Sequence, residues 1–319
     1  MNYYRPDTLE QFVGQTGVTS RIRLFVEAAL RRQEPLDHMI LSGPAGLGKT
    51  TLARIVANEL GVGFTAVGAT AVERAADLVS LLAALNYRDV LFIDEIHRLR
   101  KPIEEMLYLA MEEWVVDIPT GKGALAKVVR IQLHPFTLIG ATTRVGMLSA
   151  PLRSRFGIVF SLDFYSVNEL AEIVLKTADA IGVRITDDAA LKIARSARGT
   201  PRIANRLLRR VRDFAQVKEV ALIDSAVVSD ALKFLDIDEN GLDRMDYAFL
   251  KTIVQRFGGG PVGISAIASS LGEDRNTLED VYEPYLMKLG LVVRTPRGRI
   301  ATRRALEILA KKGEMTHGA

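Results

Sequence analysis

A lysine and two threonines follow a glycine-rich run, which matches the pattern G-x-x-x-x-G-K-[ST] from Gly43 to Thr50. Glycines allow the backbone to turn its N–H groups inward around phosphate oxygens. In this pattern the lysine reaches the β- and γ-phosphates, and the hydroxyl that follows it binds Mg²⁺. We therefore predict a P-loop that binds ATP. Its candidate binding residues are Gly46, Gly48, Lys49, Thr50 and Thr51.

Two acids end an apolar run further along the chain, where residues 90–93 lead into Asp94 and Glu95. Asp94 stands where a carboxylate would complete the shell of the Mg²⁺ ion. Glu95 is placed to orient and polarise the attacking water. An acid pair that merely ends a strand in solvent is the alternative, but the preceding P-loop favours a hydrolase. His97 is interpreted as a packed neighbour of these acids rather than as a base.

A second polar strand end follows residues 137–141, at Thr142 and Thr143. A hydroxyl at such a position can sense the γ-phosphate, whereas a threonine bonded to backbone is the alternative. We take Thr143 as the candidate sensor and include it among the catalytic residues.

Apolar runs alternate with amphipathic segments up to residue 163, which predicts strands at 38–41, 89–93 and 137–141 and a helix at 49–60. Continuous apolar strands are typical of a parallel sheet covered on both faces, so residues 1–163 are expected to form an α/β domain. Four helices, at 167–181, 187–197, 202–217 and 224–235, then predict an all-α lid domain over residues 164–236.

A third domain is expected over residues 237–319, after a polar hinge at 236–241. A helix from residue 242, a glycine-rich turn, helices at 264–271 and 277–289, and two short strands at 291–294 and 298–301 follow in that order. Three helices followed by a β-hairpin are typical of a winged helix-turn-helix.

The composition narrows the class of protein. The 319 residues are 48% apolar, which is enough for two or three domains with cores. There is no cysteine, which excludes disulfides, cysteine-based metal sites and cysteine nucleophiles. No apolar run approaches the ~20 residues needed to cross a bilayer, and the N-terminus lacks a signal-peptide pattern, so a cytoplasmic location is expected. The net charge of +4 permits an anionic partner.

The motifs together resemble an AAA+ ATPase: the P-loop, the acids at residues 94–97, the polar sensor, an arginine within residues 152–157 and the segment 199–202. Longer segments resemble the RuvB family, the bacterial motors that drive Holliday-junction branch migration. These segments are residues 5–9, 92–99, 140–144, 199–207, 282–286 and 294–299. The resemblance covers nearly the whole chain.

The resemblance implies roles for several residues. Arg155 resembles an arginine finger that reaches the nucleotide of a neighbouring subunit, with Arg153 as the rival. Arg202 resembles a second sensor carried by the lid. The expected nucleotide contacts are Tyr165 and Pro201 on one side of the adenine, Tyr4 and Arg5 on the other, and Glu112, Glu113 and Trp114 at the nucleotide interface. For the last three residues, an ordinary helix C-terminus is the alternative.

A β-hairpin is predicted at residues 115–133, because two alternating segments flank Gly121-Lys122-Gly123. In the family such a hairpin contacts RuvA, the junction-binding partner. Ile118 and Val128 are expected to be exposed apolar contacts there. A hairpin that packs on its own domain is the alternative.

Five arginines and no acid lie within residues 294–304, on the predicted wing and just after it. Such a wing suits phosphate contacts rather than base reading. By resemblance the DNA contacts are Arg275, Arg294 and Arg299, and a solvated basic face is the alternative. Most of the other arginines of residues 195–212, apart from Arg202, are expected to be solvated or to face another subunit.

The leading hypothesis is a hexameric, Mg²⁺- and ATP-dependent motor that moves Holliday junctions on duplex DNA, with a RuvA-like junction-binding protein and a RuvC-like resolvase as partners. An ATPase that loads a protein on DNA, similar to clamp loaders or origin-recognition proteins, is the second hypothesis. A protein-remodelling ATPase is more distant, because it leaves the basic wing without a purpose.

Overall fold

The computed structural model describes residues 4–120 and 127–316. The chain divides into two compact units. One unit comprises residues 5–43 and 47–163, and the other comprises Tyr4, Pro44–Gly46 and the chain from Phe164 onward. The tip of the P-loop therefore groups with the C-terminal part of the chain.

A five-stranded parallel sheet forms the centre of the first unit, in the order β2-β3-β6-β1-β7. Its strands are β1 (Met39–Ser42), β2 (Phe64–Gly68), β3 (Val90–Asp94), β6 (Thr137–Thr142) and β7 (Ile158–Ser161). In the register, Ser42 lies opposite Thr142 and Ile93 lies opposite Gly140. The carboxyl ends of β1, β6 and β3 therefore meet at one edge of the sheet.

The three expected strands are the central ones, where almost every residue is buried. Strands β2 and β7 were not among the strands predicted from the sequence. Both are outer strands whose residues are only partly buried or alternate between buried and exposed, so neither offers a continuous apolar run.

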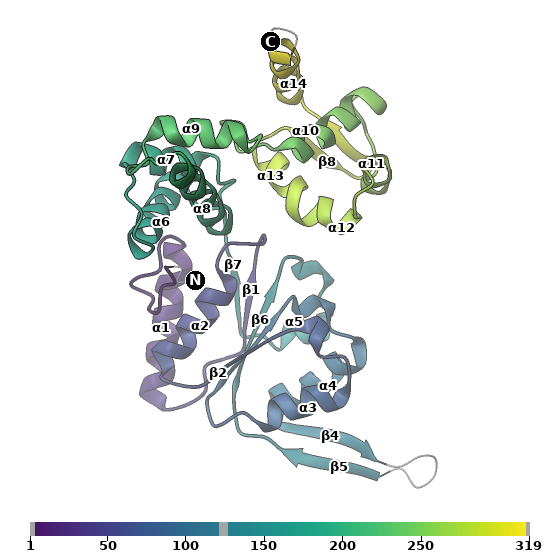
Figure 1. Ribbon diagram of the computed structural model, residues 1–319. Helices are drawn as coiled ribbons and strands as arrows, with labels where there is room; N and C mark the ends of the chain where they lie inside the picture. The colour runs from purple at the N-terminus through teal and green to yellow at the C-terminus, as the bar shows by residue number, and fades with distance from the viewer. Residues whose placement is uncertain (1–3, 121–126, 317–319) are drawn as a thin grey trace. The chain divides into compact units, whose positions relative to one another are not determined.

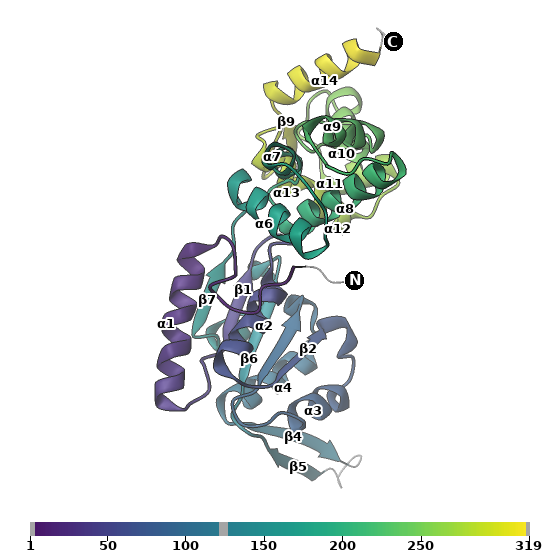
Figure 2. The same ribbon diagram turned by 60° about the vertical axis from the view of Figure 1, so that its left-hand side comes forward.

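Helices cover both faces of this sheet. Figures 1 and 2 show α1 and α2 on one face and α3, α4 and α5 on the other. Their bounds are α1 (Thr16–Arg32), α2 (Lys49–Leu60), α3 (Ala75–Ala83), α4 (Lys101–Glu112) and α5 (Ala150–Ser154). Short 3-10 turns lie at Ala69–Ala71, Ile96–Arg98 and Val145–Met147. Apolar residues such as Leu107, Phe136 and Leu138 form the core between the sheet and α4.

The inserted hairpin consists of the antiparallel strands β4 (Val115–Thr120) and β5 (Lys127–Gln132). Its expected tip, Gly121-Lys122-Gly123, lies outside the described residues. The expectation for Ile118 is wrong, because this side chain is partly buried against the core of its own domain. Val128 is 65% exposed, as expected, and Val129 beside it is 47% exposed, so β5 presents apolar surface.

The second unit begins with the four helices of the lid, α6 (Val167–Ala180), α7 (Asp187–Arg195), α8 (Pro201–Val217) and α9 (Ser225–Phe234). Side-chain caps define where these helices begin. Ser166 and Glu169 form a capping box at α6, and the Asp224 carboxylate accepts two backbone N–H groups at the start of α9. Pro201 starts α8, where its fixed φ suits the first helical turn.

The winged-helix elements follow in the expected order. They are α10 (Arg244–Lys251), which continues as the π-helical turn η5 (Thr252–Arg256), α11 (Ile264–Leu271), the continuous helical stretch of α12 (Arg275–Thr277), η6 (Leu278–Tyr282) and α13 (Glu283–Lys288), the strands β8 (Val292–Thr295) and β9 (Gly298–Ala301), and α14 (Arg303–Thr316). A separate core that includes Phe249, Ile267 and Leu286 holds them together. Among the described residues, no helix is long and apolar enough to cross a membrane.

Candidate nucleotide site and DNA-binding surface

The P-loop adopts a backbone that glycine makes possible. The φ angles of Gly43, Gly46 and Gly48 are +134°, +85° and +97°, in the region that other residues rarely adopt. A Cβ at Gly43 would lie 2.5 Å from the Leu162 carbonyl oxygen, so a side chain is excluded there. The loop ends at Lys49, the first residue of α2, whose Nζ donates to the Gly43 carbonyl at 2.7 Å. Lys49 is only 8% exposed and is held inside the loop.

Asp94 and Glu95 lie at the carboxyl end of β3, on the same sheet edge from which the P-loop departs after β1. The Asp94 carboxylate accepts the Glu95 N–H at 3.0 Å. Glu95 has a φ of +51°, which turns the chain sharply away from the strand. Arg98, which the sequence analysis did not single out, lies with its Nη1 2.7 Å from the Glu95 carboxylate. An arginine therefore positions the candidate base.

The two threonines after β6 differ in their surroundings. Thr142 is buried, its hydroxyl lies 2.9 Å from Nδ1 of His97, and that hydroxyl accepts the Arg144 N–H at 2.9 Å. The Thr142 hydroxyl thus makes its hydrogen bonds within its own domain. Thr143 is partly exposed and remains the candidate sensor. The contact also fits the interpretation of His97 as a packed neighbour of the acids.

The oxygen donors at this edge fit Mg²⁺. Thr50 offers an exposed hydroxyl and Asp94 a carboxylate. Among the described residues, no group of three or more His, Asp or Glu side chains could hold a metal ion. A site with few protein ligands is the kind that Mg²⁺ occupies together with waters and nucleotide phosphates.

Arg155 and Glu112, which were predicted separately, form one contact. Two guanidinium nitrogens of Arg155 lie 3.1 and 3.2 Å from the two carboxylate oxygens of Glu112. The same guanidinium donates to the Pro151 carbonyl at 2.7 Å and lies 4.6 Å from the centre of the Tyr108 ring. Within this chain, the candidate arginine finger is therefore paired with Glu112. Its rival, Arg153, is exposed.

Trp114 packs against two aromatic rings of its own domain. Its ring lies 5.6 Å from His38 and 5.5 Å from Phe136, between ring centres. Burial lowers the pKa of His38, so this ring is neutral at physiological pH. Glu113 caps the C-terminus of α4. For these two residues the structure fits the alternative that they simply end a helix.

The lid candidates lie in the second unit with the tip of the P-loop. The Arg202 N–H donates to the Gly46 carbonyl at 3.3 Å, and a Cβ at Gly46 would lie 2.9 Å from the Arg202 Cβ. Tyr165 is buried, and its N–H donates to the Gly199 carbonyl at 2.9 Å. Lys176 lies with its Nζ 5.8 Å from the centre of the Tyr4 ring. Arg5 belongs to the first unit.

The wing corrects one expected DNA contact. Arg294 and Arg299 face each other across the hairpin of β8 and β9, but only Arg294 is exposed. Arg299 is 7% exposed, and its guanidinium lies 2.7 and 2.9 Å from the two carboxylate oxygens of Glu283 and 3.1 Å from Glu279. The expectation that Arg299 contacts DNA does not fit this burial, because its guanidinium pairs with acids from the preceding helix.

Arg275 keeps an exposed side chain, with its Nη2 3.4 Å from Glu279. Arg297, in the turn of the wing, is exposed as well. Arg275, Arg294 and Arg297 are therefore exposed cations that a phosphate can reach.

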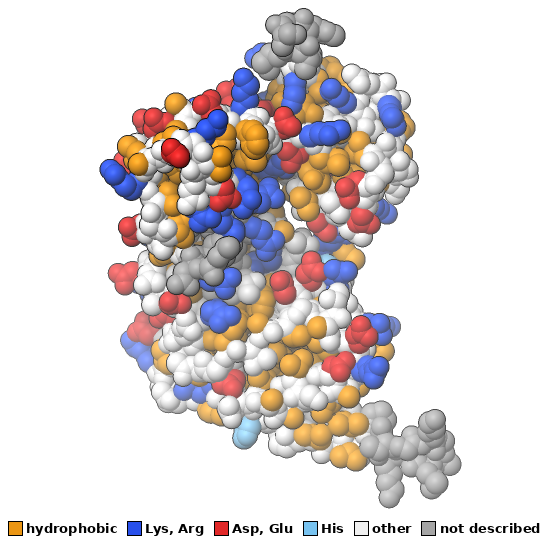
Figure 3. Space-filling view, in the orientation of Figure 1, with side chains coloured by type: hydrophobic (Ala, Val, Ile, Leu, Met, Phe, Trp, Pro, Cys, Tyr) orange, Lys and Arg blue, Asp and Glu red, His pale blue; other side chains and the backbone are white. Residues whose placement is uncertain are grey.

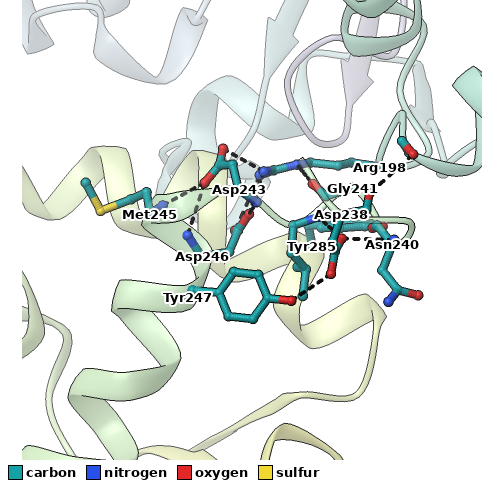
Figure 4. Close-up of polar contacts among 11 residues, drawn as sticks. Arg198, Asp238, Asn240, Gly241, Asp243, Met245, Asp246, Tyr247 and Tyr285 are labelled. Atoms are coloured by element: carbon teal, nitrogen blue, oxygen red, sulfur yellow. Dashed lines mark hydrogen bonds and ion pairs between the residues drawn. The ribbon is translucent and has the colours of Figure 1, made fainter. Parts of the chain in front are cut away.

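A buried arginine of the lid was missed. Arg198 falls in the segment expected to be solvated or to face another subunit, yet it is 5% exposed and paired with Asp243 and Asp246. Figure 4 shows its guanidinium directed at these acids and at the carbonyl of Gly241. The spacing of the two acids, which form a capping box at α10, was the available signal.

Comparisons with known proteins match the same family in all three domains of the chain. Residues 4–162 match the family model for the Holliday junction DNA helicase RuvB P-loop domain, residues 165–238 that for the RuvB AAA lid domain, and residues 239–310 that for the RuvB C-terminal winged helix domain. A solved structure of Thermotoga maritima RuvB, described as a Holliday junction branch migration motor, is 47% identical with a TM-score of 0.89. Two mutants of that protein are 48% identical with TM-scores of 0.90. Each of the three matches covers 96% of this chain and 98% of the other.

Glu95→Gln is expected to retain ATP binding and to lose turnover. The amide cannot accept the proton of the attacking water, whereas Lys49 and Thr50 are unchanged. The loss in kcat should be at least ~10²-fold, the scale of general-base removal. Steady-state hydrolysis and equilibrium binding of a fluorescent ATP analogue measure the two effects. Hydrolysis close to that of the parent would show that Glu95 is not the base.

Arg299→Ala is expected to destabilise the winged helix, because it leaves the carboxylate of Glu283 buried without its partner. Breaking a buried ion pair in this way costs ~3–5 kcal/mol. Arg294→Ala removes an exposed charge and should change stability by no more than ~0.5 kcal/mol. Hydrogen exchange of the backbone amides in α13, β8 and β9 measures the loss of stability in each of the two variants. Equal protection in the two variants would contradict the structural role of Arg299.

Proposed function

Since the chain belongs to the RuvB family of AAA+ ATPases, we propose that it works as a hexameric ring that uses ATP to drive Holliday-junction branch migration along duplex DNA. One observation carries the proposal. The P-loop lysine and the acids Asp94 and Glu95 lie at one edge of a parallel sheet, in a chain that also contains a winged helix with exposed arginines. An ATPase site and a DNA-binding module are thus parts of one polypeptide.

Hydrolysis follows from the residues at the sheet edge. Lys49 and the P-loop N–H groups would hold the triphosphate, with Thr50 and Asp94 as the residues that would hold Mg²⁺. The bound Mg²⁺ would offset charge that develops on the phosphate oxygens. Glu95 would accept the proton of the water as it attacks the γ-phosphorus, and the hydroxyl of Thr143 would hydrogen-bond the γ-phosphate. Arg98 would keep the Glu95 carboxylate in place until water and nucleotide are bound.

Assembly into a ring would complete the site. Arg155 would stabilise charge on the nucleotide of a neighbouring subunit, and Arg202 would do so from the lid of its own subunit. The Glu112 contact supports this role, because the ion pair and the single hydrogen bond from Nη2 keep the guanidinium beside the carboxylate before assembly. The adenine would lie between the lid residues Tyr165 and Pro201 and the N-terminal residues Tyr4 and Arg5.

Contact with DNA would be made to phosphates, by Arg275 and Arg294, with Arg297 beside them. A RuvA-like junction-binding protein would dock on the outer part of the hairpin, where Val128 and Val129 are exposed. Figure 3 shows hydrophobic side chains gathered on this hairpin, beside its undescribed tip. A RuvC-like resolvase would join the wider complex, in the cytoplasm.

The test of the proposed function is ATP-dependent movement of a synthetic four-way junction, with the chain alone and with a RuvA-like protein. Dissociation of the junction into its two duplex products is measured on native gels. We expect movement that requires both ATP and Mg²⁺. ATP hydrolysis without movement under any of these conditions would favour an ATPase that loads a protein on DNA.

Arg155→Ala is expected to bind ATP but to be inactive in an assembly of that variant alone, because every site then lacks its finger. Mixed with Lys49→Ala, it should regain part of the ATPase activity, since one site can combine an intact P-loop with the finger of its neighbour. Arg153→Ala is the matched control and should retain activity by itself. Absence of recovery, with subunit exchange demonstrated by fluorescence energy transfer, would exclude a finger that acts between subunits.

Arg294→Ala is expected to weaken duplex binding to a similar degree on unrelated sequences. Phosphate contacts release counterions, so the slope of log affinity against log salt is about −0.9 per phosphate neutralised. The variant should make this slope shallower by about one unit and leave ATPase activity without DNA unchanged. Salt titrations of labelled duplex binding measure it. An unchanged slope and affinity would place the DNA contact elsewhere.

A further inference from the structure

Two contacts near the turn between α7 and α8 lie within the second unit. At its C-terminal end, the Arg202 N–H donates to the carbonyl of Gly46, at the tip of the P-loop. Near its other end, the side chain of Arg198 is buried against the winged-helix domain. Five consecutive residues therefore join the phosphate-binding loop to the module proposed to bind DNA.

All three guanidinium nitrogens of Arg198 donate hydrogen bonds to residues at the start of the winged-helix domain. Its Nε donates to the Gly241 carbonyl at 2.8 Å, Nη2 donates to Asp243 at 2.7 Å, and Nη1 donates to Asp246 at 3.4 Å. Figure 4 shows these partners around the end of the side chain. The ring centre of Tyr285 lies 5.5 Å from the guanidinium carbon. A planar fork bound at several points fixes orientation as well as distance.

The two acids that bind Arg198, Asp243 and Asp246, are also bound to each other through the cap of α10. Asp246 is fully buried, and its carboxylate also accepts the Asp243 N–H at 2.8 Å, as part of the cap of α10. Burial raises the pKa of Asp246 to about 7, although the charge of Arg198 acts in the opposite direction. Removing one partner of a buried ion pair is costly, because it leaves the other charge buried without compensation.

The backbone around Arg198 brings the two domains into close packing. Gly199 has a φ of +73°, and a Cβ there would lie 2.2 Å from Nζ of Lys288 on α13. A Cβ at Gly241 would lie 2.4 Å from the Ser196 carbonyl oxygen. The expected polar hinge is likewise an ordered turn, in which the Asp238 carboxylate accepts the N–H groups of Asn240 and Leu242. The lid turn and the start of the winged helix therefore form one rigid junction.

We propose that Arg198 is a positioning residue that couples nucleotide binding to DNA binding, by fixing the winged-helix domain to the turn that carries Arg202. The inference rests on the proposed function only in taking ATP and duplex DNA as the two ligands. A change in how the P-loop tip holds Arg202 reaches the winged helix because the turn is short and its far end is bound at several points. Coupling of this kind is a free energy shared by the two sites and is reciprocal.

The experiment measures this coupling directly. Duplex affinity is determined with and without a non-hydrolysable ATP analogue, and analogue affinity with and without the duplex. In the parent, the two ratios should agree and lie between about 5- and 150-fold. Arg198→Lys keeps the charge but loses the planar fork, so both ratios should fall to within about twofold of one. Its ATPase activity without DNA should stay within about twofold of the parent.

Two further variants separate coupling from stability. Arg195→Lys changes an exposed arginine of α7 and should keep the parental ratio. Asp243→Asn removes a partner of Arg198 while keeping a good N-cap residue, so it should lower the ratio even if Arg198→Lys folds poorly. A purely structural Arg198 would lower the melting temperature in Arg198→Lys and leave the ratio at its parental value.

The outcomes distinguish this inference from the proposed function. A parental ratio in both Arg198→Lys and Asp243→Asn, or a ratio of one in the parent itself, overturns the coupling. If the parent shows the ratio and the variants lose it while no four-way junction is moved, the coupling stands and branch migration is wrong. If junctions move equally far per ATP hydrolysed in the parent and in Arg198→Lys, the coupling residue is not Arg198.

Discussion

Parallel pairing of β1, β6 and β3 is the constraint on which the nucleotide site depends. Because paired parallel strands all end at the same edge, the P-loop after β1, the polar residues after β6 and the acids after β3 are brought together, although they are far apart in the sequence. The left-handed turn at Glu95 and the glycine conformations of the P-loop then bend each segment away from its strand. Apolar burial of the central strands thus fixes where polar chemistry can occur.

Arginine is used in this chain in three distinct environments, which its sequence context alone does not separate. Arg294 is exposed and available to a phosphate. Arg155 is partly buried and paired with the half-exposed carboxylate of Glu112. Arg198 and Arg299 are buried with two carboxylates each and hold parts of the fold together. The number and burial of the acids that surround a guanidinium decide which role it can take.

The lid and the winged helix belong to one compact unit together with the tip of the P-loop. Contacts within this unit can therefore transmit a change at the P-loop tip to the winged helix. The turn from Arg198 to Arg202 includes Pro201, whose ring fixes φ at the start of α8, and the side chain of Arg198 is held by several hydrogen bonds at the other end. A stiff segment bound at both ends transmits a displacement that a flexible linker would absorb.

The sequence by itself determined the motifs and the elements that carry strong local signals. The P-loop and its helix, the central strands, the four lid helices and the order of the winged-helix elements follow from glycine placement, apolar periodicity and caps, which are local properties of the chain. The outer strands β2 and β7 were not predicted from the sequence, because their partial burial leaves no continuous apolar run. Tertiary structure alone decided the partners of the charged side chains: Arg98 with Glu95, Glu112 with Arg155, Arg198 with Asp243 and Asp246, and Arg299 with Glu283. Whether an arginine meets water, a phosphate or a buried carboxylate depends on what the fold packs against it, and for Arg198 and Arg299 those neighbours are many residues away along the chain.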